Sequence, residues 1–325
     1  MKLLFTSVGR RVELIQSFKT TAKDMNVDLH IIGADMVDTA PALYFCDDIK
    51  IVPRISSDNY IDSLLSICKE ENVDAIIPTI DTELLKLSKH KAEFEELGVK
   101  VFISDYDKIK ICRDKRYTYE YFTSIGLNSP KTFDDVENYN CGFPAFIKPK
   151  DGSSSINAYK VDNMEDLKLY ASKIENYIIQ PFISGKEYTV DIFCDYCGNP
   201  VFITPRERIA VRSGEVLKTR ICQNDVIIEE MKNLVKDFKP VGQIAVQLIQ
   251  DEFTKENYYI EINPRFGGGS PLSMKAGANS AEAIIKILNG ESLCYVPYSA
   301  RDNEIYSRYD QSVCVKAGVK RDWDK

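Results

Sequence analysis

The stretch YYIEINPRFGGGSP, residues 258–271, reads as an aromatic β-strand that ends in polar and glycine residues. Glu261 and Asn263 are two positions apart, so they share one face of a strand. Arg265 follows, and three glycines occupy 267–269. An arginine can hold a phosphoryl group through two parallel hydrogen bonds, and a glycine run lets backbone N–H groups approach an anion. The stretch therefore predicts either a polar sheet surface or the floor of an anion-binding active site.

The preceding residues extend this strand into a β-hairpin. The segment GQIAVQLIQDEFTKENYYIEINPR, residues 242–265, is typical of two strands with a turn near residue 254. That turn places Gln247 opposite Glu261, and a slip of one residue would move the set to the other face. Mg²⁺ is bound by a few carboxylate or amide oxygens together with water and substrate phosphates. We therefore predict a metal site at Gln247, Glu261 and Asn263 for Mg²⁺, with Mn²⁺ as the alternative, against a solvent-facing polar sheet.

The first 105 residues alternate short apolar runs with helical segments, which is typical of βαβ units around a parallel sheet. Ligands of such sheets gather beyond the carboxyl ends of the strands. Gly9, Arg10 and Arg11 stand at one such end, at the start of a helix, where an anion can bind. The alternative is a tight turn with two solvated arginines. The strands are expected at residues 2–8, 28–35, 47–55, 74–80 and 99–104.

Two lysines upstream of the hairpin are candidate phosphate ligands. Lys148 ends the apolar run FPAFIK, and the turn DGSSS follows shortly after it. Lys115 lies in the helical segment before that run. Glu187 follows the apolar strand IIQPFI, where it could hold ribose hydroxyls. Each residue also has a plain structural interpretation: a solvated helix face for Lys115, a surface turn for Lys148 and an exposed strand for Glu187.

Composition argues against several classes of protein. The chain has 325 residues and a net charge of −7, which disfavours a nucleic-acid surface. It contains no apolar run of the roughly 18–20 residues that span a bilayer. Two histidines, His30 and His90, are too few for a multi-histidine zinc site, and neither has the surroundings of a catalytic triad. Nine scattered cysteines, with Cys194 and Cys197 in a C-x-x-C turn that has no matching pair, indicate reduced thiols in the cytoplasm.

Taken in order, these motifs resemble the ATP-grasp superfamily, most closely its carbamoyl-phosphate-synthase-like branch of single-copy ligases. The order is an N-terminal α/β domain, a lysine on a helix, FIKP, a glycine–serine loop, a hinge strand, an acid and EINPR. The resemblance implies a mixed α/β and α+β fold. In it, a parallel pre-ATP-grasp (Rossmann-like) domain precedes an ATP-grasp domain made of two α+β subdomains. We expect these parts at residues 1–105, 106–185 and 186–325, the last with a C-terminal tail.

The resemblance also assigns roles to individual residues. Arg265 and Lys148 are implied as the catalytic residues, and Arg265 matches the arginine that contacts the transferred phosphoryl group. The implied metal ligands are again Gln247, Glu261 and Asn263. The implied nucleotide-binding residues are Lys115, Lys148, Ser153, Ser154, Ser155, Gln180, Pro181, Phe182, Ile183 and Glu187. The implied substrate-binding residues are Arg206 or Arg212, in the segment TPRERIAVRSGE, and Gly268.

The implied activity is ATP- and Mg²⁺-dependent ligation of a small carboxylate to an amine through an acyl phosphate. The implied partners are these small substrates, amino acids among them, with no nucleic acid and no membrane, for a cytoplasmic homodimer. One alternative is phosphorylation of bicarbonate or carbamate, although carbamoyl-phosphate synthase large subunits usually carry two tandem halves and this chain has room for one. A second alternative is a nucleotide-binding regulator without turnover, against which Glu261, Asn263 and Arg265 argue.

Overall fold

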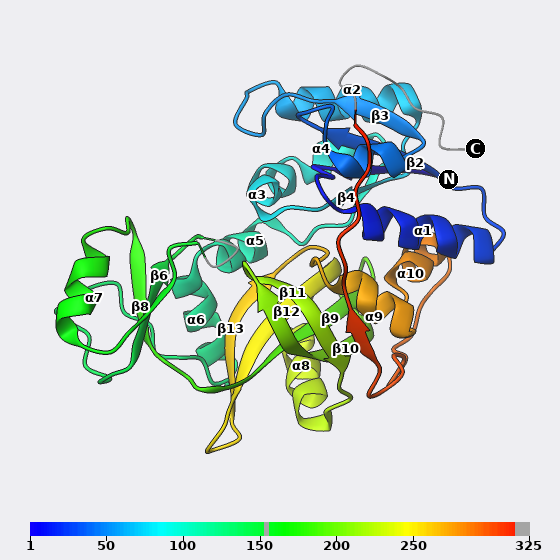
Figure 1. Ribbon diagram of the computed structural model, residues 1–325. Helices are drawn as coiled ribbons and strands as arrows, with labels where there is room; N and C mark the ends of the chain where they lie inside the picture. The colour runs from blue at the N-terminus through cyan, green and yellow to red at the C-terminus, as the bar shows by residue number, and fades with distance from the viewer. Residues whose placement is uncertain (153–155, 316–325) are drawn as a thin grey trace.

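The computed structural model describes residues 1–152 and 156–315, and its first part is a parallel five-stranded sheet (Figure 1). The strands are β1 (Lys2–Thr6), β2 (His30–Asp35), β3 (Asp48–Ile51), β4 (Ala75–Pro78) and β5 (Lys100–Val101). Their order is β3-β2-β1-β4-β5, which confirms the parallel α/β domain expected from the sequence. The helices are α1 (Val12–Asp24), α2 (Tyr60–Glu71), α3 (Asp81–Lys89) and α4 (Lys91–Glu96), with the 3₁₀ helix η1 (Pro41–Phe45).

Both faces of the parallel sheet are buried, because the side chains of β1 alternate between them. Leu3 and Phe5 pack with α1 on one face, whereas Leu4 packs with α2, α3 and α4 on the other. The ring of Phe5 meets that of Phe18 in α1 edge to face, with centroids 5.0 Å apart. Phe266, from the third part of the chain, packs on the same ring of Phe18. One apolar core therefore joins the first and third parts of the chain.

The middle of the chain forms two helices and a small antiparallel sheet, drawn at the left of Figure 1. The helices α5 (Tyr106–Arg113) and α6 (Lys115–Ser124) meet at Asp114. The Asp114 carboxylate accepts a hydrogen bond from the backbone N–H of Arg116 and caps α6. The sheet has the order β7-β6-β8, with α7 packed on it. Its elements are β6 (Ala145–Pro149), β7 (Tyr159–Val161), α7 (Met164–Ala171) and β8 (Tyr177–Pro181).

A six-stranded sheet forms the third part, and it contains both hairpins expected from the sequence. Its strands are β9 (Gly185–Cys194), β10 (Pro200–Arg212), β11 (Glu215–Ile221), β12 (Gly242–Asp251), β13 (Asn257–Asn263) and β14 (Ile305–Ser307). Their order is β13-β12-β9-β10-β11-β14. The helix α8 (Asp225–Phe238) covers one face through a stripe of buried side chains that includes Ile228, Met231 and Val235.

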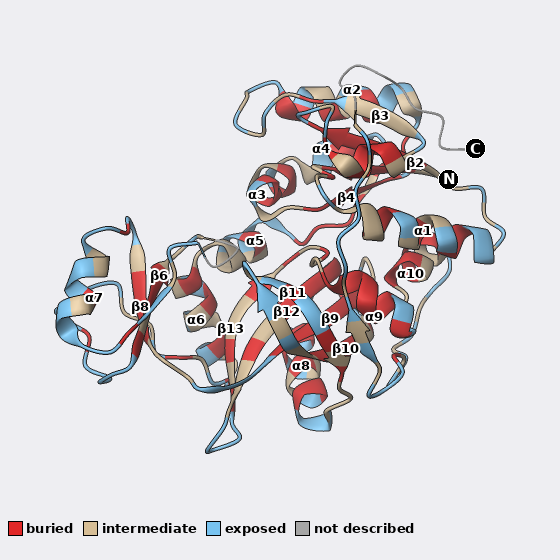
Figure 2. Cartoon of the chain, in the orientation of Figure 1, coloured by how far each residue is buried: buried red, intermediate tan, exposed pale blue. Residues whose placement is uncertain are grey.

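Two short helices bring the third part against the first. The helices α9 (Ser270–Ala276) and α10 (Ser280–Leu288) pack beside α1, and Asn279 Nδ2 donates a hydrogen bond to Thr21 Oγ1 at 3.0 Å. Buried residues continue through α9 and the neighbouring strands in Figure 2. The helix α5 begins at Tyr106 and β9 at Gly185, close to the expected boundaries, although the domain division itself stays a prediction. The carboxyl edge of the parallel sheet consequently faces the end of β13.

Candidate active site

A cavity of about 720 Å³ lies where the three parts of the chain meet. This volume is within the range of small-molecule sites, about 300–1,000 Å³. Most of the site residues expected from the sequence line it: Lys115, Lys148, Gln180, Pro181, Phe182, Ile183, Glu187, Arg206, Gln247, Glu261, Asn263, Arg265 and Gly268. Arg212 is exposed at the end of β10 and is not among the lining residues. Ser153, Ser154 and Ser155 lie outside the described residues.

The pairing of β12 with β13 places the expected metal ligands on one face. Gln247 pairs with Glu261 in the ladder, which confirms the register expected from the turn position. Asn263, two residues after Glu261, donates a hydrogen bond from Nδ2 to Glu261 Oε1 at 2.9 Å. That bond turns the amide so that Asn263 Oδ1 is available as a ligand. All three side chains line the cavity.

This ligand set fits Mg²⁺ held jointly with phosphates. In residues 1–152 and 156–315, no group of three or more histidine, cysteine or acidic side chains is placed to hold a metal ion. One carboxylate and two amides supply part of an octahedral shell, and Mg²⁺ usually completes such a shell with water and substrate phosphates. The residues present therefore match a metal that binds together with a nucleotide better than one enclosed by the protein alone.

Lys148 is a buried cation without a counter-charge in contact. It lies in β6, it is 8% exposed, and its ammonium makes no hydrogen bond or ion pair with a described residue. The ammonium lies 5.7 Å from the centroid of the Phe146 ring. Burial and then the charge of Lys115 lower the pKa of Lys148 to about 8, while Glu261 opposes the shift. A buried ammonium of this kind is a candidate ligand for an anion, and the phosphate contact expected of Lys148 stays a prediction.

Lys115 forms hydrogen bonds with the backbone at the beginning of the glycine–serine loop. It is the first residue of α6 and is buried. Its ammonium donates a hydrogen bond to Gly152 O at 2.6 Å, and its backbone N–H donates to Lys150 O at 2.9 Å. Burial lowers the pKa of Lys115, and the nearby Glu261 carboxylate acts in the opposite direction. The phosphate contact expected of Lys115 stays a prediction, while the contact in the structure is with the backbone before Ser153.

The end of β8 forms an apolar slot at the place expected for adenine. Gln180 is buried, and its Nε2 donates to Thr132 Oγ1 at 2.8 Å. The chain then enters β9 at Gly185, where an added Cβ would lie 1.9 Å from Gln250 O of β12. Only glycine allows this approach, which fixes the backbone of 181–184 at the rim of the cavity. The apolar side chains that the middle part of the chain contributes to the lining include Pro130, Phe146, Phe182 and Ile183.

Glu187 shares the cavity with Arg208, a lining residue that the sequence reasoning missed. The Arg208 side chain is 8% exposed, and its Nε donates to Glu187 Oε2 at 3.1 Å. It also donates to Thr189 Oγ1 at 3.2 Å and to Gly214 O at 3.0 Å. Burial lowers the pKa of Arg208, and Glu187 opposes this shift. The ion pair holds one oxygen of Glu187, whose side chain is 52% exposed, so the other oxygen can accept bonds from a ligand.

Arg265 links the end of β13 to the first part of the chain. Its Nε donates to Asp81 Oδ2 at 2.9 Å, and its Nη1 donates to Phe266 O at 3.0 Å. Asp81 begins α3, directly beyond the carboxyl end of β4. Both side chains are largely buried, at 13% and 12% exposed. The arginine expected to contact the transferred phosphoryl group is therefore held by Asp81 of the first part of the chain and by the backbone of its own segment.

Arg206 is held by a hub of polar side chains. It is 1% exposed, and its Nε donates to Asp191 Oδ2 at 2.6 Å. The same carboxylate accepts hydrogen bonds from Ser270 Oγ at 3.0 Å and Ser273 Oγ at 2.6 Å. Arg206 Nη1 also donates to Thr219 Oγ1 at 3.4 Å. The substrate contact expected of Arg206 stays a prediction, whereas the structure places its guanidinium in a buried ion pair.

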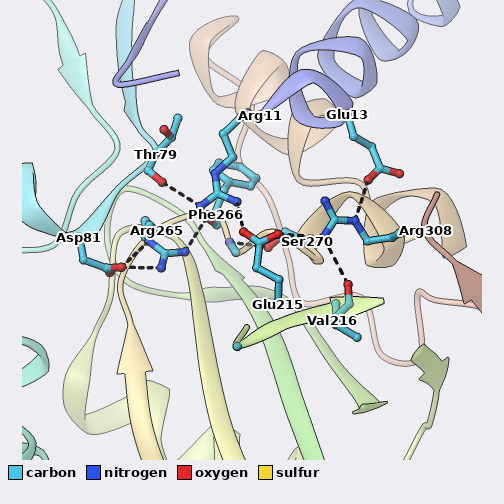
Figure 3. A network of polar contacts seen from close by, with 12 residues as sticks. Arg11, Glu13, Thr79, Asp81, Glu215, Val216, Arg265, Phe266, Ser270 and Arg308 are labelled. Atoms are coloured by element: carbon cyan, nitrogen blue, oxygen red, sulfur yellow. Dashed lines mark hydrogen bonds and ion pairs between the residues drawn. The ribbon is translucent and has the colours of Figure 1, made fainter. Parts of the chain in front are cut away.

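A second arginine cluster at the cavity involves Arg11 of the first part of the chain (Figure 3). Arg11 Nη1 lies 3.8 Å from Glu215 Oε1, and Arg308 Nη1 donates to Glu215 Oε2 at 3.3 Å. Arg308 Nε lies 3.6 Å from Glu13 Oε2. Sequence reasoning named Arg11 as an anion-binding candidate but gave no signal for Glu215 or Arg308. These residues are more than 200 positions from Arg11, and only the fold brings them together.

A buried carboxylate supports the turn that carries Arg11. Glu83 in α3 is fully buried and accepts hydrogen bonds from Thr6 Oγ1 at 3.0 Å, Ser7 Oγ at 3.0 Å and Tyr60 O–H at 2.7 Å. Burial raises the pKa of Glu83, and these hydrogen bonds act against the shift. Ser7, with φ of 52°, is the bend that leads from β1 into the turn. Glu83 thereby positions the turn between β1 and α1.

Comparison with known proteins agrees with this fold and site. Residues 3–102 match the family model of the PylC-like N-terminal domain, and residues 112–269 match that of the ATP-grasp domain. The fold and the cavity are those expected of a nucleotide-dependent ligase. The family match identifies the type of nucleotide-binding domain as ATP-grasp. Residues 112–269 belong to the ATP-grasp family, whose members are ATP-dependent ligases that use Mg²⁺.

Individual relatives are distant in sequence but alike in fold. The chain is 24% identical over 269 residues to a carbamoyl-phosphate synthase of Methanobrevibacter smithii, which covers 75% of this chain and 70% of the relative. It spans about half or less of the carbamoyl phosphate synthase large chains that it also matches.

Two solved structures illustrate the shared fold. The biotin carboxylase domain of Hydrogenobacter thermophilus 2-oxoglutarate carboxylase superposes with a TM-score of 0.75 at 19% identity, over 94% of this chain and 73% of that one. An L-amino acid ligase of Bacillus licheniformis superposes with a TM-score of 0.70 at 17% identity, over 88% and 74%. In the part of this chain that the structure describes, no helix is long and apolar enough to cross a membrane.

Proposed function

We propose that the protein is an ATP- and Mg²⁺-dependent carboxylate–amine ligase, which activates a small carboxylate as an acyl phosphate for attack by an amine. One observation carries the proposal. Glu261 and its metal-binding partners share a cavity with two buried lysines and with the anchored Arg265. This combination of a part-filled metal shell and unpaired positive charge suits a triphosphate at the point where its terminal group is transferred.

The protein's own residues supply positioning and charge. In this proposal Lys148 and Lys115 bind the phosphates, the apolar slot at the end of β8 binds the base and Glu187 binds the ribose; all of these residues line the cavity. Gln247, Glu261 and Asn263 would hold Mg²⁺, which would offset the negative charge that develops on the phosphates. Arg265, fixed by Asp81, stabilises the same charge at the acyl end. Among the residues that the structure describes, no histidine lines the cavity, in keeping with a reaction that depends on positioning more than on acid–base catalysis.

The nucleotide and acyl ends of the cavity are closed by different parts of the chain. The slot and Lys148 come from the middle part, whereas Arg11 and Asp81 come from the first part. An acyl phosphate formed beside Arg265 would lie between them, screened from water on both sides. Such screening favours attack by a bound amine over hydrolysis of the intermediate.

A second candidate function is phosphorylation of bicarbonate or carbamate. The names of the curated relatives favour it, since the first of them is a carbamoyl-phosphate synthase that this chain spans to 70%. The Hydrogenobacter protein was also solved with MgADP and bicarbonate. The two candidates differ in the acid that is activated, so they share the ATP site and differ at Arg11 and Glu215.

The test is release of ADP and phosphate from ATP and Mg²⁺ with panels of small carboxylates and amines, amino acids included. We expect turnover that requires both an acid and an amine. The variant Glu261→Ala should lower it by about 100-fold or more, because the only carboxylate of the metal shell is removed. Glu256→Ala, in the exposed turn of the same hairpin, is the matched control. Full activity of Glu261→Ala would contradict the metal assignment, and phosphate release with bicarbonate alone would favour the second candidate.

The same proposal includes a homodimer in the cytoplasm. The dimer is supported by the Hydrogenobacter protein, whose biotin carboxylase domain is a dimer. Support for the cytoplasm comes from the nine scattered cysteines, a pattern typical of reduced thiols. Light scattering at several protein concentrations measures the oligomeric state directly.

A further inference from the structure

Arg11 has fewer protein partners than the other arginines that line the cavity. Its side chain is 19% exposed and projects from the turn between β1 and α1. Among the described residues its guanidinium makes a single hydrogen bond, from Nη2 to Thr79 O at a long 3.5 Å. A guanidinium carries five N–H donors. Arg206 and Arg208, by contrast, are each held by a carboxylate within 3.1 Å and by further acceptors.

The charges around Arg11 also favour the binding of an anion to its guanidinium. Burial and the charge of Arg265 lower its pKa to about 10, while Glu215 and Asp81 act in the opposite direction. Asp81 is already bound by Arg265, and Glu215 lies 3.8 Å from Arg11 without a hydrogen bond to it. A carboxylate is the anion that matches a guanidinium with two parallel hydrogen bonds.

Glu215 offers the opposite charge next to Arg11. Its side chain is 51% exposed and lines the cavity, with Oε2 bound by Arg308 and Oε1 facing Arg11. Charges alternate along the row Glu13, Arg308, Glu215 and Arg11, as Figure 3 shows. A carboxylate oxygen beside an unsatisfied guanidinium forms a pair of recognition groups of opposite sign.

Gly268 keeps the space between these two groups open. A Cβ at this position would lie 3.1 Å from Arg11 Nη1 and 3.4 Å from Glu215 Oε1. Any side chain there would occupy the place where both groups can be reached at once. The backbone of Gly268 therefore borders a small pocket with a cation on one wall and an anion on the other.

We propose, on the basis of the ligase function above, that this pocket binds an α-amino acid as one of the two substrates, with its carboxylate on Arg11 and its ammonium group on Glu215. The two charged groups of an α-amino acid are attached to one carbon, which matches protein groups only 3.8 Å apart. A dicarboxylate would place its second acid group beside Glu215, and a diamine would place an ammonium group beside Arg11. In each case two groups of like charge would meet, so repulsion disfavours dicarboxylates and diamines as ligands.

The proposal is tested by binding rather than by turnover. Isothermal titration calorimetry in the presence of MgADP measures the affinity for each standard L-amino acid and for D-alanine. For each amino acid that binds, the deaminated acid and the decarboxylated amine with the same side chain are measured as well. We expect each analogue to bind about tenfold or more weakly than the parent amino acid, because each loses one charge-assisted contact.

Variants assign the two ends of the ligand. Arg11→Gln should weaken the amino acid and the deaminated acid by about tenfold, and leave the decarboxylated amine within about twofold. Glu215→Gln should weaken the binding of the amino acid and of the decarboxylated amine by about tenfold, and leave the deaminated acid within about twofold. Arg54→Gln is the control, because Arg54 is an exposed arginine in the loop between β3 and α2 and is not among the residues that line the cavity. It should leave all three affinities unchanged.

The outcomes separate this inference from the ligase function. Failure of wild-type protein to bind MgADP would overturn the proposed function itself. Binding of MgADP without binding of any amino acid would overturn only the inference, as would deaminated acids that bind as tightly as amino acids. An amino acid whose affinity is insensitive to both Arg11→Gln and Glu215→Gln would overturn it too. Unchanged MgADP affinity and unfolding midpoints in the variants show that each protein is folded.

Discussion

Two arginines of the same cavity, Arg206 and Arg11, illustrate opposite uses of a buried guanidinium. Arg206 belongs to a closed hub, in which Asp191 is bound by the arginine and by two serine hydroxyls. Arg11 belongs to an open row, in which its hydrogen bond is 3.5 Å long and its ion pair 3.8 Å. Both residues are arginines that line the cavity. They differ in the number of their hydrogen-bond and ion-pair partners and in the distances to those partners. The comparison indicates that the hub holds the fold together and the row remains available to a ligand.

The largest effect is expected from breaking the hub. Asp191→Ala should destabilise the protein by about 3–5 kcal/mol, because it leaves the buried charge of Arg206 without a partner. Arg11→Gln should change the free energy of unfolding by less than about 1 kcal/mol, since its ion pair is long and partly solvated. Urea unfolding of both variants measures the difference.

A double variant checks the cause of that loss. Asp191→Leu combined with Arg206→Met removes both charges, and it should recover much of the stability lost in Asp191→Ala. If Asp191→Ala and Arg11→Gln were equally stable, the distinction between a closed hub and an open row would be wrong. If the double variant were no more stable than Asp191→Ala, the loss would have come from packing or from the serine contacts.

A smaller effect is expected at the glycine run, where neighbouring residues touch the two arginines separately. A Cβ at Gly269 would lie 2.8 Å from Arg206 Nη2, and the buried ion pair prevents that side chain from moving away. Gly269→Ala should therefore destabilise the protein by about 1–3 kcal/mol by overpacking. Gly267→Ala is the control, because its Cβ would meet nothing closer than 3.4 Å.

Gly268→Ala extends this prediction to the open row. Its Cβ would meet the end of the Arg11 side chain, which is free to shift, so stability should change by less than about 1 kcal/mol. Amino-acid binding should weaken instead, because the pocket between Arg11 and Glu215 is filled. Thermal or urea unfolding and calorimetry on the same three alanine variants give both measurements. A stability loss at Gly268 as large as that at Gly269 would contradict the comparison.

The sequence predicted the parts of the site that depend on local geometry. The period of two along a strand put Glu261 and Asn263 on one face, and a turn centred near residue 254 placed Gln247 opposite Glu261. The alternation of strands and helices predicted the parallel sheet in the same way. In each case a short stretch of chain determines which residues are neighbours.

The remaining parts depend on which distant segments meet, and the sequence carries little of that information. Arg206, Arg208 and Arg212 lie within one short segment, and nothing in their spacing indicates that Asp191 binds the first and Glu187 the second. Glu215 and Arg308 meet Arg11 only because β11 and the chain after β14 lie against the turn at β1. The tertiary fold decides which side chains contact one another. A residue that matches a ligand-binding motif can therefore have a structural role instead.

The effect expected at Glu83, which supports the Arg11 turn from beneath, depends on pH. Burial raises its pKa above that of the unfolded chain, near 4.5, so the folded protein binds a proton that the unfolded chain releases. Stability from this group is therefore present below that value and is lost as pH rises toward the folded pKa. The slope for one proton is at most about 1.4 kcal/mol per pH unit. Glu83→Gln should flatten this part of the pH dependence.

Urea unfolding of wild type and Glu83→Gln between about pH 5 and about pH 8 measures that slope. Glu252→Gln, an exposed acid in the loop after β12, is the control and should follow wild type. Because Glu83 binds Thr6 and Ser7 just before the turn, its variant should also weaken amino-acid binding slightly, through the position of Arg11. Parallel pH curves for wild type and Glu83→Gln would show that the buried carboxylate contributes no such proton. Unchanged amino-acid affinity would show that the turn keeps Arg11 in place without it.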